Sequence, residues 1–511
     1  MFCQFFFGIF EKNIVFFFDL GYNVLKLGKI WEREIKKMNY SDIKTLGEFR
    51  DFLKGKSVSV VGIGISNIPL LKFLCECGAK KISARDKKDI FADGKIPELS
   101  QLEEKIAISY ILGDDYLKGL NEDIIFKTPG IRRDLPEFVE AQNSGSVITS
   151  EMELFFMLCP ATTIAVTGSA GKTTTTTIIG EILKASGKNV FVGGNIGEPL
   201  LCDIENIKKE DFAVLELSSF QLFDLDNGKF APNIAVFTNI TPNHLDWHRD
   251  MCEYIAAKKI IYKNQKESDK LILGHDDELM QSIAKEAKSK ICFFFGDILP
   301  ECHKNGVYFD GDDIFVRDNG EQKKMIKKSD IKIRGNYNIL NFMAAIAATH
   351  EIAGKEAILS VAKTFGGVEH RMEFVGEIGG VLYYNSSIDS TPTRTLAALN
   401  YFEQDKKIIA ILGGSDKNID FEPLVPTIYI KAKAAVLYGA TKEKINKCLE
   451  AHKKDDFAIY ISDSFDLAAK KAKELAEPGD IVLLSPACAS FDCFKNFEER
   501  GERFKEIVRG F

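Results

Sequence analysis

Residues 162–187 read TTIAVTGSAGKTTTTTIIGEILKASG, which is an apolar β-rich run, a glycine loop and a helical segment in succession. This order predicts a phosphate-binding loop between a strand and a helix, because glycines let backbone N–H groups curl around phosphate oxygens. The amino terminus of the helix adds partial positive charge. The residues expected to bind ATP in this loop are Gly168, Ser169, Ala170, Gly171, Lys172, Thr173 and Thr174.

Within the loop, Lys172 is expected to reach the β and γ phosphate oxygens, and the hydroxyl of Thr173 suits Mg²⁺. The loop departs from the full G-x-x-x-x-G-K-[ST] signature, since Val166 stands at the first glycine position. Its shorter G-x-x-G-K-T form still favours ATP over the alternative, a tight strand-to-helix turn without a ligand.

Composition limits the class of protein. The chain has 511 residues, 45% of them hydrophobic and 28% charged, which is the balance of a globular protein with more than one core. The formal net charge of −7 argues against a nucleic-acid partner, which would require a clustered excess of Lys and Arg. The eleven cysteines lack a paired framework or metal-ligand spacing, so reduced thiols in the cytoplasm are expected.

The first 37 residues are crowded with Phe and have no clear period. Glu11 and Lys12 interrupt the apolar run, which leaves it too short for a spanning helix, and no small-residue cleavage site follows. We hypothesise that translation begins at Met38; the alternative is a peripheral amphipathic anchor. Stable membrane insertion is not expected.

Strand-like and helical patterns alternate beyond this stretch, which predicts an α/β fold with mostly parallel sheets. Residues 57–86 have the pattern of one βαβ unit, and helices are expected over 251–267 and 335–354. The segments VLYYN, KIIAILGG, AAVLYG and DIVLLSP predict a parallel, doubly wound unit near the carboxyl terminus. The expected division is an extension at 1–47 and three domains at 48–158, 159–368 and 369–511.

A second glycine turn follows the first strand of the βαβ unit. Gly62 and Gly64 resemble the start of a dinucleotide fingerprint, but Asn67 stands where its third glycine would be. Asp86 lies where a ribose-binding acid would stand. A UDP-type nucleotide is favoured, and NAD or a purely structural turn are the alternatives.

Polar residues follow two further strands of the central region. Glu216 comes directly after DFAVL, at the carboxyl end of a strand, where a metal-binding acid is expected. His244 and His248 are spaced like a zinc pair, but no third soft ligand accompanies them, so magnesium with a His contact is expected instead. Lys258 lies on the next helix, and a solvated lysine is the usual fate of such a residue.

Eight segments taken together resemble the Mur ligase family, in order from about residue 57 to the end of the chain. They are GSAGKTTTT, GGNIGEPL, ELSSFQL, TNITPNHLDWH, YIAAKKIIY, EHRMEFV, LGGSDK and SPACASFDCFKNFEERG. The last segment is most similar to the members of the family that add D-glutamate.

The resemblance implies an ATP-dependent amide ligase that joins D-glutamate to UDP-N-acetylmuramoyl-L-alanine through an acyl phosphate. Such an enzyme serves peptidoglycan precursor synthesis, and through it cell shape and cell division. The implied architecture is a Rossmann-like UDP-binding domain, a central ATPase domain and a mobile Rossmann-like carboxyl-terminal domain. The implied partners are the three substrates alone, and a monomer is expected.

The resemblance also implies roles for individual residues. Those implied for the UDP substrate are Ile65, Ser66, Asp86, Asn195, Ser218 and Gln221. Those implied for ATP outside the loop are Asn338, Asn341, His370 and Arg371, and those for D-glutamate are Lys417, Ser490 and Phe497. Catalytic roles fall on Lys172, Glu216, His244 and Lys258. The implied Mg²⁺ ligands are Thr173, Glu216, His244 and Lys258, the last as a carbamate formed with CO₂.

The chain departs from the family pattern near residue 386. The family reads D-S-K-A-T where this chain has Ser386-Ser387-Ile388-Asp389-Ser390, which loses an acid and a lysine expected near ATP. Asp389 is a candidate substitute for that acid. Tyr337 likewise replaces a histidine common in the family.

Rival functions remain open. One is a sister ligase that adds another amino acid, or a folate polyglutamate synthase. Another is a P-loop switch without enzymatic activity, or a nicotinamide oxidoreductase, either of which would leave Lys258, Lys417 and Ser490 without a role.

Overall fold

The computed structural model describes residues 7–10, 13–16, 39–64, 67–91, 97–197, 199–226, 229–245, 247–275, 278–333, 335–402, 405, 407–416, 420–452 and 457–511. These residues form two compact units. The first runs to Cys159 and includes residues 201–205, and the second comprises residues 160–200 and 206–511. The expected three-domain boundaries near 158 and 368 stay a prediction.

The first unit is built on a parallel five-stranded sheet of order β5-β4-β3-β6-β7. Strand β3 has β4 on one side and β6 on the other, so the loop that follows β3 leaves the sheet where strand order reverses. The elements are β1 Phe7–Phe10, β2 Asn13–Phe16, η1 Tyr40–Asp42, α2 Leu46–Leu53, β3 Val58–Val61, α3 Asn67–Glu76, β4 Lys81–Asp86, α4 Pro97–Glu103, β5 Ala107–Leu112, β6 Ile124–Lys127, α5 Pro136–Asn143, β7 Val147–Thr149, α6 Glu151–Leu158 and η2 Leu200–Asp203. The expected βαβ unit is confirmed as β3, α3 and β4.

The hypotheses about the amino terminus fall largely outside the described residues. Among the first 38 residues, β1 and β2 pair as an antiparallel hairpin. Residues 17–38 are not described. In the described part of the chain, every helix is too short or too polar to cross a membrane.

The second unit begins with a nine-stranded sheet of order β16-β15-β14-β13-β12-β11-β8-β10-β9. Strand β8 lies between β10 and β11, so this sheet also reverses its strand order at its first strand. Its elements are β8 Thr162–Thr167, α7 Lys172–Ala185, β9 Val190–Gly194, β10 Phe212–Glu216, α8 Ser219–Asp224, β11 Ile234–Phe237, α9 Met251–Lys263, β12 Lys270–Gly274, α10 Glu278–Glu286, β13 Lys290–Phe295, β14 Gly306–Asp310, β15 Asp313–Asp318, β16 Glu321–Lys327, η3 Lys328–Asp330 and α11 Asn336–Thr364.

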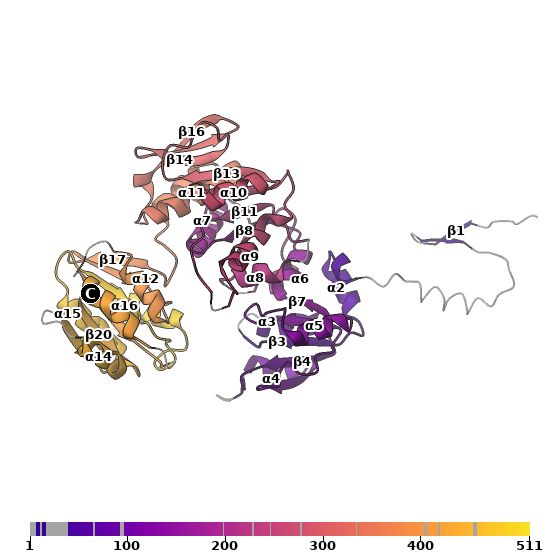
Figure 1. The fold of residues 1–511 in the computed structure, drawn as a ribbon, viewed down its shortest axis with the longest axis horizontal. Coiled ribbons are helices and arrows are strands. Elements are labelled where there is room, and N and C mark those ends of the chain that lie inside the picture. Colours follow the sequence, from indigo (N-terminus) through magenta and orange to yellow (C-terminus); the bar gives the residue numbers. More distant parts are fainter. Residues whose placement is uncertain are drawn as a thin grey trace, which may run out of the picture. The chain divides into compact units, whose positions relative to one another are not determined.

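Helices α7 and α11 pack against each other and against this sheet (Figure 1). Ile178 and Ile182 lie one turn apart on α7, and Phe342 and Ile346 lie one turn apart on α11. All four side chains are fully buried in one cluster with Val166 of β8. The apolar stripes of the two helices therefore hold the glycine loop against a rigid base.

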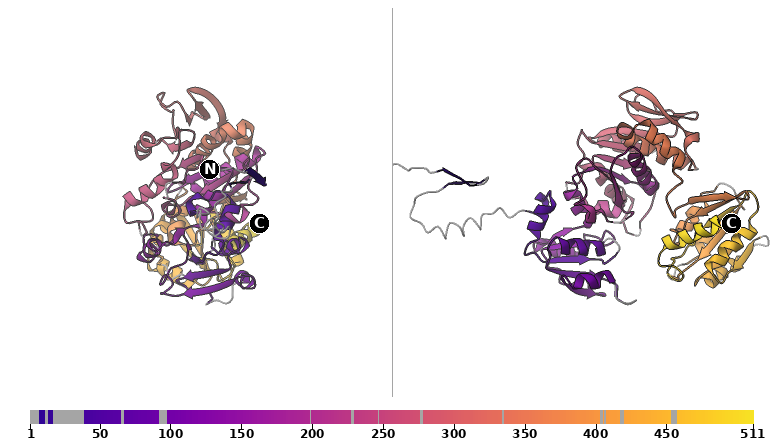
Figure 2. Two further views of the ribbon diagram at one scale, coloured as in Figure 1. Left: turned by 90° about the vertical axis from the view of Figure 1, so that its right-hand side faces the viewer. Right: turned by 180° about the vertical axis from the view of Figure 1, so that it is seen from behind.

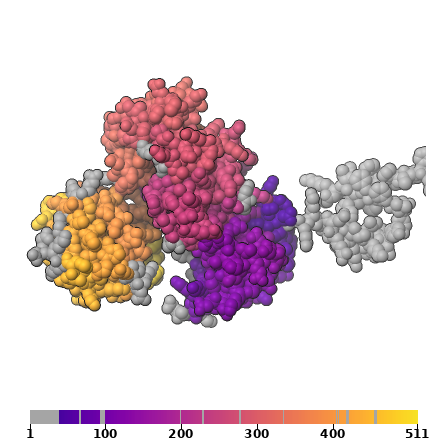
Figure 3. Space-filling view, in the orientation of Figure 1, coloured from indigo at the N-terminus to yellow at the C-terminus, as the bar shows by residue number. Residues whose placement is uncertain are grey.

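The carboxyl-terminal part of the second unit has a six-stranded sheet of order β17-β18-β22-β19-β20-β21. Figure 2 shows α16 lying along it, and Figure 3 shows this region as one body in orange and yellow. Its elements are β17 Glu373–Ile378, β18 Val381–Asn385, α12 Pro392–Leu399, β19 Ile408–Gly413, η4 Glu422–Leu424, α13 Val425–Lys431, β20 Ala432–Tyr438, α14 Lys442–Ala451, β21 Ala458–Ile461, α15 Phe465–Leu475, β22 Ile481–Leu484 and α16 Phe497–Arg509.

The α/β class with mostly parallel sheets is confirmed, but several details differ from expectation. Strand β17 pairs with β18 in the antiparallel sense, and β14, β15 and β16 form an antiparallel meander. Helix α9 ends at Lys263, and α11 continues to Thr364 after a break at Gly354, whose φ of 74° is not helical. The helix can resume after Gly354 because glycine adopts a left-handed φ without a side-chain clash.

Candidate active site

The glycine loop adopts the backbone that its sequence predicts. Gly168 has a φ of 148° and Gly171 a φ of 79°, both in the region that disfavours side chains. A Cβ at Gly168 would overlap Thr238 Oγ1, and one at Gly171 would overlap Asn341 Oδ1. Gly171 caps α7, so the loop delivers its backbone to the amino terminus of that helix.

A second segment, which follows β11, holds the loop in place. Ala170 N donates to Asn239 Oδ1 at 2.9 Å, and Asn239 Nδ2 donates to Ala170 O at 3.0 Å. Thr238 Oγ1 also donates to Ala170 O, at 2.6 Å. These bonds leave the loop open toward the carboxyl edge of the sheet, where a phosphate would bind.

Lys172 folds back onto its own loop. Its Nζ donates to Gly168 O at 3.0 Å and to Ser169 O at 3.1 Å. Burial lowers the pKa of Lys172 from its ordinary value, Glu216 opposes this, and the positive charge of Arg371 adds to it. An anion at the loop would therefore meet an ammonium whose present partners are only neutral carbonyl groups.

Glu216 ends β10 and is 2% exposed. Its Oε1 accepts a hydrogen bond from Asn195 Nδ2 at 3.0 Å, whereas its buried Oε2 has no hydrogen-bond partner. A buried carboxylate oxygen without a partner is costly unless a cation or a donor completes it.

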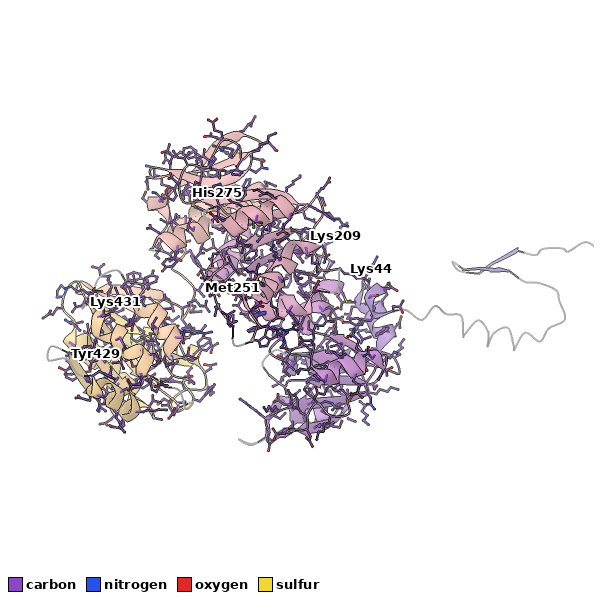
Figure 4. The ribbon with its side chains drawn as sticks, in the orientation of Figure 1. Lys44, Lys209, Met251, His275, Tyr429 and Lys431 are labelled. Carbon is purple, nitrogen blue, oxygen red and sulfur yellow. The ribbon has the colours of Figure 1, made fainter. Side chains whose placement is uncertain are left out.

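Lys258 is buried, contrary to the usual fate of a lysine, and is 1% exposed. It lies on α9, the helix that begins at Met251 in Figure 4, and its Nζ donates to Gly168 O at 2.8 Å. Burial lowers the pKa of Lys258 well below its ordinary value, and the charge of Lys172 lowers it further, whereas Glu216 raises it. The side chain is therefore held toward its neutral amine form.

The two histidines of the next loop have different surroundings. His244 is exposed on the cavity, has a φ of 55° and packs edge-on against Phe220. His248 is 1% exposed, and its Nε2 lies 2.9 Å from Ser219 Oγ. The two histidines therefore have different roles: His244 faces the cavity, whereas His248 is buried and contacts Ser219.

Most of these groups line one cavity of about 500 Å³. Its lining includes the loop from Ser169 to Thr173 together with Asn195, Glu216, Ser218, His244, Lys258, Arg371, Ser386, Ile388, Asp389 and Arg394. Gln221 lies outside the lining, because its side chain caps α8 by accepting from Ser218 N and Oγ at 3.0 Å.

A second cavity of about 610 Å³ adjoins the same loop. Asn338 and Asn341 of α11 line it, and so do the aromatic rings of Tyr337 and Tyr401, whose centroids are 5.5 Å apart. Asn341 Nδ2 donates to Asn338 Oδ1 at 3.3 Å. A flat nucleobase would fit this lining, because its faces can pack against aromatic rings and its edges can form hydrogen bonds with the asparagine amides.

The structure does not bring all the expected residues to these cavities. His370, Ser490 and Phe497 line neither of them. Ile65, Ser66 and Lys417 lie outside the described residues. In the first unit, Asp86 accepts hydrogen bonds from Ile63 N at 2.7 Å and Lys88 N at 2.8 Å, so its carboxylate orders the turn after β3.

The expected magnesium site can be tested against these side chains. Glu216 offers an unpartnered oxygen, and Thr173 and His244 line the same cavity. Lys258 offers an amine near its neutral form, which is the form that combines with CO₂. Glu216 and Thr173 offer oxygen ligands, which suit a hard divalent cation.

Three contributors were missed in the sequence. Tyr254 OH lies 2.8 Å from Ser169 Oγ, Tyr401 closes the second cavity, and Arg394 lines the first and donates to Ile388 O at 3.0 Å. Tyr254 stands in the YIAAKKIIY segment, four residues before Lys258, and this spacing could have indicated it. Tyr401 and Arg394 lie outside the quoted segments, so only the tertiary structure could reveal them.

Two segments match known family models. Residues 166–349 match the Mur ligase middle domain, and residues 370–488 match the Mur ligase, glutamate ligase domain. A UDP-N-acetylmuramoylalanine–D-glutamate ligase from Clostridium novyi (strain NT) is 48% identical over 91% of this chain and 99% of its own length. The protein of the same name from Clostridium perfringens (strain 13 / Type A) is 46% identical, with the same coverage.

Solved structures share the fold at low sequence identity. The UDP-N-acetylmuramate-alanine ligase of Thermotoga maritima is 19% identical, with a TM-score of 0.51 over 89% of this chain and 99% of that one. At this identity the likeness concerns the fold alone.

Gly171→Ala tests the loop against a matched control at the other end of α7. Gly187 has the same φ of 79°, but a Cβ there would meet open space. Both substitutions should cost about 1 kcal/mol of stability from left-handed strain, and Gly171→Ala should cost more because its Cβ would overlap Asn341 Oδ1. Only Gly171→Ala should also weaken ATP binding, by at least about tenfold, as measured by calorimetric titration. Equal ATP affinity in the two variants would contradict the assignment of the loop.

Proposed function

We propose that this chain, which belongs to the Mur ligase family, joins D-glutamate to UDP-N-acetylmuramoyl-L-alanine. The family membership makes it an ATP-dependent ligase of peptidoglycan precursor synthesis. The observation that carries the proposal is the cavity where Lys172, Glu216 and Lys258 meet beside the glycine loop. The names of the two clostridial relatives support the choice of amino acid.

The reaction has two balanced steps. The L-alanyl carboxylate attacks the γ-phosphorus of ATP, forming an acyl phosphate as the bond to the β-phosphate oxygen breaks and ADP leaves. The D-glutamate amine then attacks the acyl carbon, a C–N bond forms, phosphate departs, and the amine gives up its proton.

The residues of the chain manage the charge in the first step, in which two anions must meet. Lys172 exchanges its carbonyl partners, Gly168 O and Ser169 O, for phosphate oxygens. The loop N–H groups bind the same phosphate, and Arg371 faces it from the carboxyl-terminal part of the unit. Fixed positive charge of this kind is the largest expected contribution to catalysis of phosphoryl transfer.

The metal site belongs to this proposal. Thr173, Glu216, His244 and carbamylated Lys258 would hold Mg²⁺, which supplies charge neutralisation at the transferred phosphoryl group. The buried neutral amine of Lys258 would add to CO₂ and lose a proton, which would turn an uncharged amine into an anionic oxygen ligand. The orphaned Glu216 Oε2 and the lowered pKa of Lys258 support this assignment.

Asn338 and Asn341 are proposed to face the adenine, and Lys417, Ser490 and Phe497 to bind D-glutamate. A cation and a hydroxyl group are what an amino dicarboxylate needs, because its carboxylate must exchange water for charge-assisted hydrogen bonds. Ile65, Ser66, Asp86, Asn195, Ser218 and Gln221 are proposed for the UDP substrate. We also propose a cytoplasmic monomer; the described cysteines are all free thiols, which supports a reducing compartment.

The decisive experiment measures phosphate release with each substrate omitted in turn. Release that requires ATP, UDP-N-acetylmuramoyl-L-alanine and D-glutamate together supports the proposal. Release with another amino acid in place of D-glutamate would indicate a sister ligase. Release that is independent of the UDP substrate would indicate a nucleotide switch.

Glu216→Gln and Lys172→Ala should each lower the rate at least about a hundredfold, because each removes a charge worth on the order of 3 kcal/mol in the transition state. Glutamine retains the acceptor for Asn195, so the fold should survive. Glu210→Gln, an exposed position just before β10, is the matched control and should leave the rate unchanged. Near-normal turnover by either site variant would contradict the assignment.

Lys258→Ala should lose activity, and a small carboxylate such as acetate should restore part of it by occupying the place of the carbamate. The control is Lys263→Ala, an exposed lysine on the same helix that pairs with Asp226 at 2.7 Å. Steady-state rates with and without acetate measure the effect. A fully active Lys258→Ala enzyme would rule out carbamylation as a requirement.

A further inference from the structure

Arg371 is carried by a tight turn, here called the arginine turn, at residues 368–372. Arg371 N donates to Val368 O at 3.1 Å, which closes a four-residue turn. His370 and Met372, on either side of the arginine, have φ values of 58° and 46°. A turn of this kind normally places glycine or asparagine at its left-handed position, so a histidine there is strained.

Strain of this kind persists only where the surroundings enforce it. Ile388 N donates to His370 O at 3.1 Å, and Met372 N donates to Ser386 Oγ at 3.2 Å. The backbone on both sides of Arg371 is therefore fastened to the segment that follows β18.

The His370 ring is held from beneath. Asn385 is fully buried, and its Nδ2 lies 3.0 Å from His370 Nδ1 and donates to Glu373 Oε2 at 3.0 Å. His370 N donates to the same Glu373 oxygen at 2.9 Å. Asparagine thus fixes both the ring and the carboxylate that holds the backbone of the histidine.

Helix α16 provides the floor of this arrangement. A Cβ at Gly501 would overlap His370 Nδ1 and would lie 3.0 Å from Asn385 Nδ2, so only glycine leaves room for the ring. Lys505, one helical turn further on, has its Nζ 2.5 Å from Glu369 Oε1 and 2.6 Å from Glu502 Oε1. Glu369, His370 and Glu502 cluster like metal ligands, but this ammonium already neutralises the two carboxylates.

We propose that His370, Asn385 and Gly501 form a buried lock that holds the arginine turn in its nucleotide-binding conformation. His370 is then a positioning residue that acts through Arg371 and does not touch the nucleotide. Arg371 lines both cavities beside the glycine loop, whereas His370, Asn385 and Gly501 line neither. The inference rests on the proposed function, because it takes ATP to be the ligand of Arg371.

Gly501→Ala tests the lock, with Gly510→Ala at the end of the same helix as its control. A Cβ at Gly510 would make only ordinary contacts, the nearest at 3.4 Å. Gly501→Ala should raise the dissociation constant and the KM for ATP at least about tenfold, because the substitution misplaces Arg371. The kcat at saturating ATP should fall by a smaller factor, because bound ATP and the remaining charges of the glycine loop still position the phosphate. Gly510→Ala should match the unsubstituted protein.

Asn385→Asp provides a second variant in case Gly501→Ala fails to fold. The new carboxylate would lie against that of Glu373 and could not donate to it, so the two like charges should displace the turn and ATP binding should weaken in the same way. A proton shared between Asp and Glu would restore one donor, so affinity should recover as pH falls from 8 to 6, relative to the unsubstituted protein. Glu502, Lys505 and Glu369 are the other charged groups that face this site.

ATP affinity is measured by calorimetry without the other substrates, which separates the two hypotheses. Protein that binds ATP but does not ligate D-glutamate would contradict the proposed function and leave the lock measurable. Folded Gly501→Ala and Asn385→Asp variants that bind ATP within twofold of the unsubstituted protein would overturn the lock. A fall in kcat with unchanged ATP affinity would overturn it equally.

Discussion

The chemistry of this chain depends on charges buried together at the carboxyl edge of the central sheet. Glu216 lies in the same cavity as Lys172 and Lys258, and burial, together with the charge of Lys172, lowers the pKa of Lys258. One lysine rests on carbonyl groups of its own loop, and the carboxylate has an oxygen without a partner. The carboxylate oxygen is therefore open to a cation, and the buried basic groups are open to the phosphates of a nucleoside triphosphate.

The fold explains why these groups meet. Strand β8 lies between β10 and β11, and the strand order of the sheet reverses there. The loop after β8 therefore opens into the crevice that forms at such a reversal. Glu216 ends the adjacent β10, and the His244 loop follows β11 on the other side. Three separate stretches of sequence thus reach one point, because parallel strands end at the same edge.

The segment after β18 shows how a departure from the family pattern can be absorbed. Ser386, where the family has an acid, is 1% exposed and accepts a hydrogen bond from Met372 N. Asp389 lines the same cavity as Ser386 and supplies a carboxyl group there. Burial raises the pKa of this carboxyl group, which also accepts a hydrogen bond from Ser485 Oγ at 2.8 Å. A short hydroxyl side chain here supports the turn that carries Arg371.

The sequence alone determined the α/β class, the βαβ unit of residues 57–86 and the phosphate loop, because each rests on local periodicity and on glycine chemistry within a few residues. It also indicated that Glu216 and His244 would share an edge. Only the tertiary structure decided that β17 runs antiparallel to β18, that Lys258 is buried, that His370 meets Asn385 and that Tyr401 meets Tyr337. These outcomes depend on contacts between residues far apart in the chain, and the free energy of such contacts is not visible in any local pattern.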